Sequence, residues 1–126
     1  MVSEQILVVE DNEKNMKLVR DVLQATGYRT LEATTGGQAV ELAVEHAPGL
    51  VLMDIRLPDL DGLEVLRRLR ADARTASIPV VALTAQAMQG DRERFLSGGF
   101  DGYVSKPVDI VELVRTVGRH CEARAR

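Results

Sequence analysis

Polar side chains capable of chemistry stand where apolar segments of this chain end. They are three carboxylates, one hydroxyl and one ammonium, in chain order Glu10, Asp11, Asp54, Thr84 and Lys106. If the apolar segments are parallel strands, their carboxyl ends lie along one edge of the sheet, where open α/β folds bind ligands. The spacing therefore predicts one acidic pocket with a single positive charge.

Carboxylates held this close repel one another, so such a cluster is stable mainly when a cation lies among them. Oxygen ligands favour a hard ion, and Mg²⁺ suits a site with few protein ligands because it keeps several waters. Neither histidine nor the cysteine stands beside these carboxylates, which argues against zinc. A carboxylate can also attack phosphorus to form an aspartyl phosphate, while Mg²⁺ and a lysine neutralise the phosphoryl oxygens.

The apolar segments that must position these groups have the composition of buried strands. Residues 6–9, 50–53 and 80–83 are continuous apolar runs, which suit strands covered on both faces of a parallel sheet. Residues 30–33 and 103–105 are weaker strand candidates. The sequence thus predicts five strands.

Helical patterns separate the strand candidates. Three amphipathic patterns end before Gly27, Pro48 and Asp72, a shorter helix is expected over residues 91–97, and a last one carries apolar residues from Ile110 onward. Alternating strands and helices with short connections predict an α/β fold, in which right-handed crossovers cover both faces of a parallel sheet.

Composition limits the class of protein. The 126 residues suit one domain, expected to span 1–126, and 45% apolar with 28% charged residues is ordinary for a globular protein. The start of the chain lacks the features of a signal peptide, and a single cysteine excludes an internal disulfide, so a cytoplasmic location is expected. Short apolar runs exclude membrane insertion, and the net charge of −3 gives no broad attraction for nucleic acid.

Four motifs carry a resemblance to a known family. They are VVEDN at 8–12, LMDIRLPDLDG at 52–62, ALTA at 82–85 and YVSKP at 103–107. In this order they resemble the receiver domains of two-component response regulators, over essentially the whole chain. The resemblance implies a flavodoxin-like fold of five β-α units with strand order 2-1-3-4-5.

The resemblance also implies roles for the acidic residues. Asp54 would accept a phosphoryl group. Asp11 and Asp54 would bind Mg²⁺ together with the backbone carbonyl of Arg56, and Glu10 would assist through water. Many receivers have two aspartates where this chain has Glu10 and Asp11, so the longer first side chain should tune metal affinity.

A second group of residues would sense the phosphoryl group. Lys106 would pair with it, and the bond from Lys106 to Pro107 would be cis, as is usual in the family. Thr84 would move to hydrogen-bond the phosphate, and Tyr103 would turn inward as the switch.

Partners follow from the same resemblance. A histidine kinase or a histidine phosphotransfer protein would supply the phosphoryl group. Output to a downstream regulated protein would pass through the segment 86–100, the strand at Tyr103 and the helix from Asp109, and the same face could form a homodimer. The stretches 12–18 and 84–91 look like those of a stand-alone cell-cycle regulator and of receivers in hybrid histidine kinases. Such a protein is not an enzyme, because it catalyses only its own phosphorylation and dephosphorylation.

Simpler structural readings stand beside these roles. An acidic pair after a strand often complements a helix dipole, a lysine is ordinarily a solvated charge, and Tyr103 could simply be packed. His46 and His120 are expected at the surface near helix ends. Asp59 and Asp61 belong to a segment typical of turns.

Other functions remain alternatives. A scaffold of receiver fold would act without phosphorylation. An Mg²⁺-dependent aspartyl-phosphate phosphatase would need an acid two residues after the nucleophile, where this chain has Arg56. A nucleotide-binding module would need a phosphate-cradling loop after the first strand, but that loop is acidic.

Overall fold

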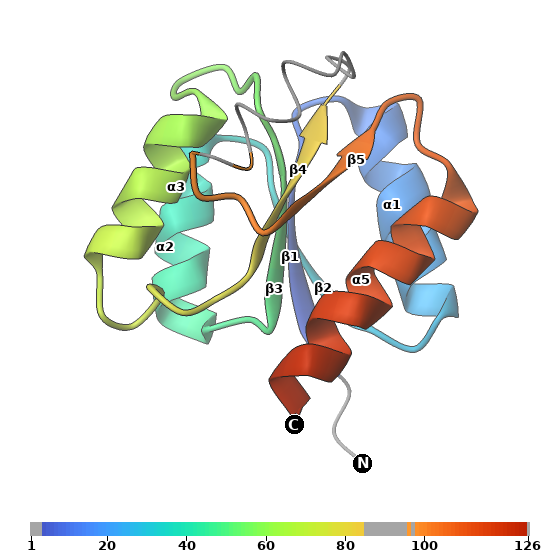
Figure 1. Cartoon of the computed structure of the whole chain (residues 1–126). Helices are drawn as coiled ribbons and strands as arrows, with labels where there is room; N and C mark the ends of the chain where they lie inside the picture. Colours follow the sequence, from blue (N-terminus) through green and yellow to red (C-terminus); the bar gives the residue numbers. More distant parts are fainter. Residues whose placement is uncertain (1–3, 85–95, 97, 126) are drawn as a thin grey trace.

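A five-stranded parallel sheet forms the centre of the molecule (Figure 1). The computed structural model describes residues 4–84, 96 and 98–125, with side chains up to residue 121. The strands are β1 (Gln5–Val9), β2 (Arg29–Ala33), β3 (Leu50–Asp54), β4 (Val80–Thr84) and β5 (Gly102–Ser105). Their order is β2-β1-β3-β4-β5, and every pair is parallel. Both the α/β class and the strand order are as predicted.

Helices cover both faces of this sheet. They are α1 (Glu13–Ala25), α2 (Gly36–His46), α3 (Gly62–Ala71) and α5 (Ile110–Ala125). In Figure 1, α2 and α3 lie side by side on one face, and α1 and α5 lie on the other. The short helix expected over 91–97 falls mostly outside the described residues.

Two aliphatic layers hold the helices on the sheet. Leu7 and Val9 point into the layer under α2 and α3, whereas Ile6 and Val8 point into the layer under α1 and α5. The central strands β3 and β4 are buried at every position, which accounts for their continuous apolar sequences. None of the described helices is long and apolar enough to cross a bilayer.

Polar caps place three helix starts at one edge of the sheet. Asn12, Thr35 and Asp61 each adopt an extended backbone and accept a hydrogen bond from the first turn of α1, α2 or α3. Each cap lies shortly after the carboxyl end of a strand, so the positive helix ends gather where the strands deliver their terminal side chains. That edge carries the candidate site.

Candidate functional site

The predicted site residues meet at the carboxyl edge of the sheet. Asp54 and Thr84 are the last residues of β3 and β4, Glu10 directly follows β1, and Lys106 directly follows β5. They line a cavity of about 400 Å³. Of the seven residues that the sequence singles out, six line this cavity, namely Glu10, Asp11, Asp54, Arg56, Thr84 and Lys106.

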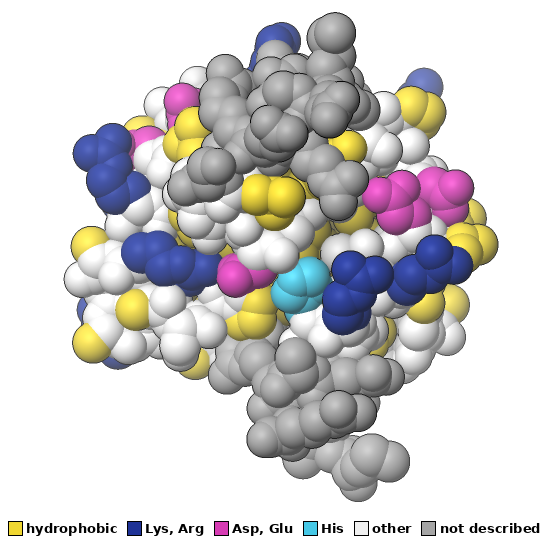
Figure 2. All heavy atoms as spheres, viewed as in Figure 1, with side chains coloured by type: hydrophobic (Ala, Val, Ile, Leu, Met, Phe, Trp, Pro, Cys, Tyr) yellow, Lys and Arg dark blue, Asp and Glu magenta, His cyan; other side chains and the backbone are white. Residues whose placement is uncertain are grey.

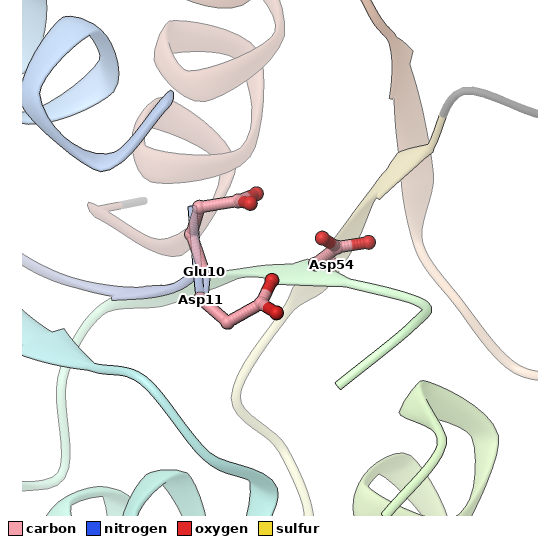
Figure 3. Close-up of side chains that lie close together, drawn as sticks. All are labelled: Glu10, Asp11 and Asp54. Carbon is pink, nitrogen blue, oxygen red and sulfur yellow. The ribbon is translucent and has the colours of Figure 1, made fainter. Parts of the chain in front are cut away.

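Three carboxylates converge in this cavity. Glu10 is 1% exposed and Asp54 is 8% exposed, whereas Asp11 lies at the open side. One oxygen from each lies within 4.8 Å of the others (Figure 3). The donor set is oxygen only and partly open to solvent, and it therefore fits a hard divalent cation that retains water.

Lys106 places a largely buried positive charge between two of these carboxylates. Its Nζ donates to Oε2 of Glu10 at 2.7 Å and to Oδ2 of Asp54 at 2.9 Å, and its side chain is 14% exposed. Burial opposes the ammonium charge, but the hydrogen bonds to Glu10 and Asp54 outweigh it, so the pKa of Lys106 lies above its usual value. The ammonium is held charged between the two buried carboxylates.

For Glu10, burial outweighs the hydrogen bond from Lys106. Burial is the largest influence on its carboxyl group, and the charge of Asp54 adds to it. The hydrogen bond from Lys106 acts in the other direction but does not compensate, so the pKa of Glu10 is raised. A single lysine leaves the acidic cluster undercompensated, and a cation beside it would relieve the repulsion.

The loop between β3 and α3 folds back beside Asp54. The backbone N–H of Arg56 donates to Oδ1 of Asp54 at 3.1 Å, and Arg56 pairs with Asp61 in an isolated antiparallel bridge. The N–H of Gly62 donates to the carbonyl of Ile55 at 2.7 Å. These bonds fix the path of the backbone that follows Asp54, while the Arg56 side chain is exposed.

Thr84 and Tyr103 lie on neighbouring strands but face different surroundings. Thr84 is 2% exposed at the cavity, and its carbonyl accepts from the N–H of Lys106 at 2.8 Å. Tyr103 is half-buried, packs against the cluster under α2 and α3, and lines a second hollow of about 390 Å³ beside α5. The bond from Lys106 to Pro107 is cis, as expected.

The second hollow carries a feature that sequence reasoning missed. His120 is half-buried, and its Nδ1 and Nε2 lie 2.8 Å and 3.1 Å from the carbonyl oxygens of Thr116 and Asp101. The histidine is partly exposed near the end of α5, as expected, and it also joins α5 to the segment before β5. Figure 2 shows Lys and Arg side chains beside a histidine on this face of the molecule, and Arg115 and Arg119 line the same hollow as His120.

Comparison with known proteins identifies the family of this chain. Residues 6–118 match the family described as "Response regulator receiver domain". The chain belongs to the response regulator receiver family. Its curated relatives include the polar-differentiation response regulator DivK of Brucella ovis, which is 47% identical over 116 residues covering 92% of this chain and 94% of the relative. DivK of Brucella anthropi is 48% identical over 112 residues, 89% of this chain and 91% of the relative.

Solved receiver structures share the fold. The receiver domain of the sensor histidine kinase PA1611 from Pseudomonas aeruginosa PAO1 is 40% identical, with a TM-score of 0.88 over 96% of this chain and 99% of that one. That structure has a magnesium ion coordinated in its active-site cleft. The chemotaxis regulator CheY4 of Vibrio cholerae shares the fold at 23% identity, with a TM-score of 0.88 over 94% and 99% of the two chains. This receiver domain is thus a DivK-like member of two-component signalling.

Proposed function

We propose that this receiver domain is a phosphorylation-dependent signalling switch, in which Asp54 accepts a phosphoryl group in the presence of Mg²⁺. The observation that carries the proposal is the position of Asp54, which shares Lys106 with Glu10 and has Asp11 within reach of the same cation. A nucleophilic carboxylate, a metal site and a fixed positive charge are the components that phosphoryl transfer to an aspartate requires.

Glu10, Asp11, Asp54 and the backbone carbonyl of Arg56 are the groups that would hold the ion. Mg²⁺ bound there would neutralise phosphoryl oxygens and orient the incoming group. Asp11 and Asp54 are the better placed for direct contact, because one is open to solvent and the other faces the cavity. Glu10 already accepts a hydrogen bond from Lys106, which suits a supporting role through water.

The donor in this proposal is a phosphohistidine of a histidine kinase or a histidine phosphotransfer protein. An oxygen of Asp54 attacks phosphorus, the phosphorus–nitrogen bond breaks, and the histidine nitrogen retains the electron pair and takes up a proton. Lys106 then contacts the phosphoryl oxygens, since its Nζ already lies 2.9 Å from Oδ2 of Asp54. Thr84, at the end of the adjacent strand β4, would donate a hydrogen bond from its hydroxyl to the phosphoryl group.

Output would follow from a shift of Thr84 and Tyr103. The two residues lie on paired strands: Thr84, the last residue of β4, pairs with Ser105, and Tyr103 pairs with Ala82, two residues before Thr84. Movement of Thr84 toward the phosphate would change the packing beside Tyr103 and alter the face made by β5, α5 and the segment 86–100, most of which lies outside the described residues. A regulated protein, or a second copy of this chain, would bind that face.

A phosphotransfer profile tests the proposal. Each histidine kinase and phosphotransfer protein of the organism that encodes this chain would be phosphorylated and then mixed with the receiver domain. Rapid Mg²⁺-dependent transfer from one or a few donors is expected, and the Asp54→Asn variant should accept nothing. A chain that accepts no phosphoryl group from any donor would instead be a scaffold of receiver fold.

A further inference from the structure

The carboxylate of Asp59 joins the loop beside Asp54 to a helix from another part of the chain. Its Oδ1 accepts the backbone N–H of Gly36 at 2.7 Å, and its Oδ2 accepts that of Gly37 at 2.9 Å. These glycines are the first two residues of α2, whereas Asp59 lies near the tip of the loop between β3 and α3. Each oxygen of the carboxylate therefore satisfies one donor that a helix start leaves unpaired.

Helix α2 receives this charge from outside its own sequence. The first turns of α1 and α3 contain Glu13 and Glu64, but that of α2, which is described along its whole length, contains no acidic residue. Its own cap, Thr35, accepts from the N–H of Gln38 at 3.1 Å and leaves the first two N–H groups to Asp59. Those hydrogen bonds lower the pKa of Asp59, so the carboxylate is charged at neutral pH.

Packing reinforces the connection. A Cβ at Gly36 would lie 2.8 Å from Cγ2 of Val65 and 2.9 Å from Cβ of Leu60, so only glycine allows the loop and α3 to approach this closely. Leu60 also packs against the apolar layer under α2 and α3. The tip of the loop is thus held by the hydrogen bonds that Asp59 accepts and by the apolar contacts of Leu60.

We infer that Asp59 is a positioning residue for the metal site, because it fixes the loop that carries Arg56 by tying that loop to α2. The inference rests on the proposed function, in which the backbone carbonyl of Arg56 is a metal ligand. Bonds at the base of the loop set its start and end, and at its tip Asp59 supplies the hydrogen bonds to α2 while Leu60 supplies apolar contact. Removing the charge weakens the hydrogen bonds that hold the tip, and the carbonyl of Arg56 is then less firmly positioned.

The test compares Asp59→Asn with Asp72→Asn as a matched control. Asp72 is half-buried and, like Asp59, accepts a backbone N–H, that of Arg74 at 2.9 Å, but it lies at the far end of α3. Mg²⁺ alone is titrated into each protein and followed by amide NMR. Acetyl phosphate phosphorylation is then measured at limiting and at saturating Mg²⁺.

Asp59→Asn is expected to raise the Kd for Mg²⁺ by at least about threefold, less than the roughly 10–100-fold typical of groups that bond metal ligands directly. Its phosphorylation rate at saturating Mg²⁺ should lie within about twofold of the native rate, and Asp72→Asn should change neither quantity. The Gly36 and Gly37 amides should exchange faster in Asp59→Asn alone. An unchanged Kd in Asp59→Asn would overturn the inference, as would a rate that stays low at saturating Mg²⁺. Failure of the native protein to bind Mg²⁺ would instead refute the proposed function.

Discussion

The ammonium of Lys106 lies 2.9 Å from Oδ2 of Asp54, whose carboxylate we propose as the phosphoryl acceptor. The contact joins the end of β5 to the end of β3 across β4, which lies between them in the sheet. It neutralises part of the acidic cluster before any cation or phosphoryl group arrives. The same contact makes the lysine sensitive to any change at Asp54.

Replacing Lys106 with methionine should destabilise the metal-free protein. The change leaves Glu10 and Asp54 buried without their shared donor, so the free energy of unfolding should fall by about 2 kcal/mol, somewhat below the loss for a fully buried pair. Urea unfolding with and without Mg²⁺ measures this, and the ion should restore more stability to the variant than to the native protein. Equal effects of Mg²⁺ on both proteins would contradict this role of the lysine.

Replacing Glu10 with glutamine should have the opposite effect on the metal-free protein. The pKa of Glu10 is raised above its usual value of 4.5, so the ionised form destabilises the native state at neutral pH, and the native state binds a proton more readily than the unfolded chain. The gain in Tm from Glu10→Gln should therefore be largest near pH 7 and shrink as the pH falls through the native pKa. Glutamine retains an acceptor for Lys106.

Mg²⁺ should reverse that order of stability. The native protein has three carboxylates at the site and should gain more Tm from the ion than Glu10→Gln does. Thermal unfolding at several pH values, with EDTA or with Mg²⁺, separates the two effects. A variant that is less stable than the native protein at neutral pH in EDTA would show that Glu10 is not strained by burial.

Replacing Gly62 or Gly118 with alanine should change the stability of the protein in opposite directions. A Cβ at Gly62 would lie 2.9 Å from Cα of Ile55 and 3.0 Å from the carbonyl oxygen of Asp54, so Gly62→Ala must displace the backbone after the acceptor. We expect a loss of about 1–3 kcal/mol together with slower phosphorylation. At Gly118, inside α5, a Cβ would meet no atom of the described residues within 4 Å, and Gly118→Ala should add roughly 0.5–1 kcal/mol without changing the rate. Chemical unfolding and phosphorylation assays on both variants test the pair.

Replacing Thr84 with alanine should separate phosphorylation from output. The variant should still accept a phosphoryl group, because the carboxylates and Lys106 remain. The amide shifts that phosphorylation causes around Tyr103 and α5 should be smaller than in the native protein. Thr26→Ala is the control, since that hydroxyl donates to the carbonyl of Val22 at the end of α1. Shifts of native size in Thr84→Ala would remove Thr84 from the switch.

Local sequence predicts much of this fold because the relevant signals are short in range. The apolar run at 50–53 indicates a buried strand, and the structure extends it by one residue to Asp54. The pattern ending before Gly27 places the end of α1 within two residues, at Ala25. The cluster of Glu10, Asp11 and Asp54 was also predictable, since parallel strands bring their carboxyl ends together whatever the loops do.

Contacts between distant loops are less accessible to sequence reasoning. Asp59 lies in a segment typical of turns, and nothing in its spacing indicates a bond to Gly36, which is 23 residues earlier. His120 likewise depends on the angle at which α5 crosses the sheet, because its two carbonyl partners come from α5 and from the segment before β5. Such contacts follow from packing of whole elements, for which no local pattern exists.

Phosphorylation of the purified protein by acetyl phosphate is the decisive test of whether Asp54 is a phosphoryl acceptor. The native chain would be incubated with acetyl phosphate and Mg²⁺, and its intact mass would be measured beside that of Asp54→Asn and of a sample in EDTA. We expect the mass of one added phosphoryl group, labile to base, only in the native chain that received both acetyl phosphate and Mg²⁺. An unchanged native mass, or an equal gain in Asp54→Asn, would contradict this role of Asp54.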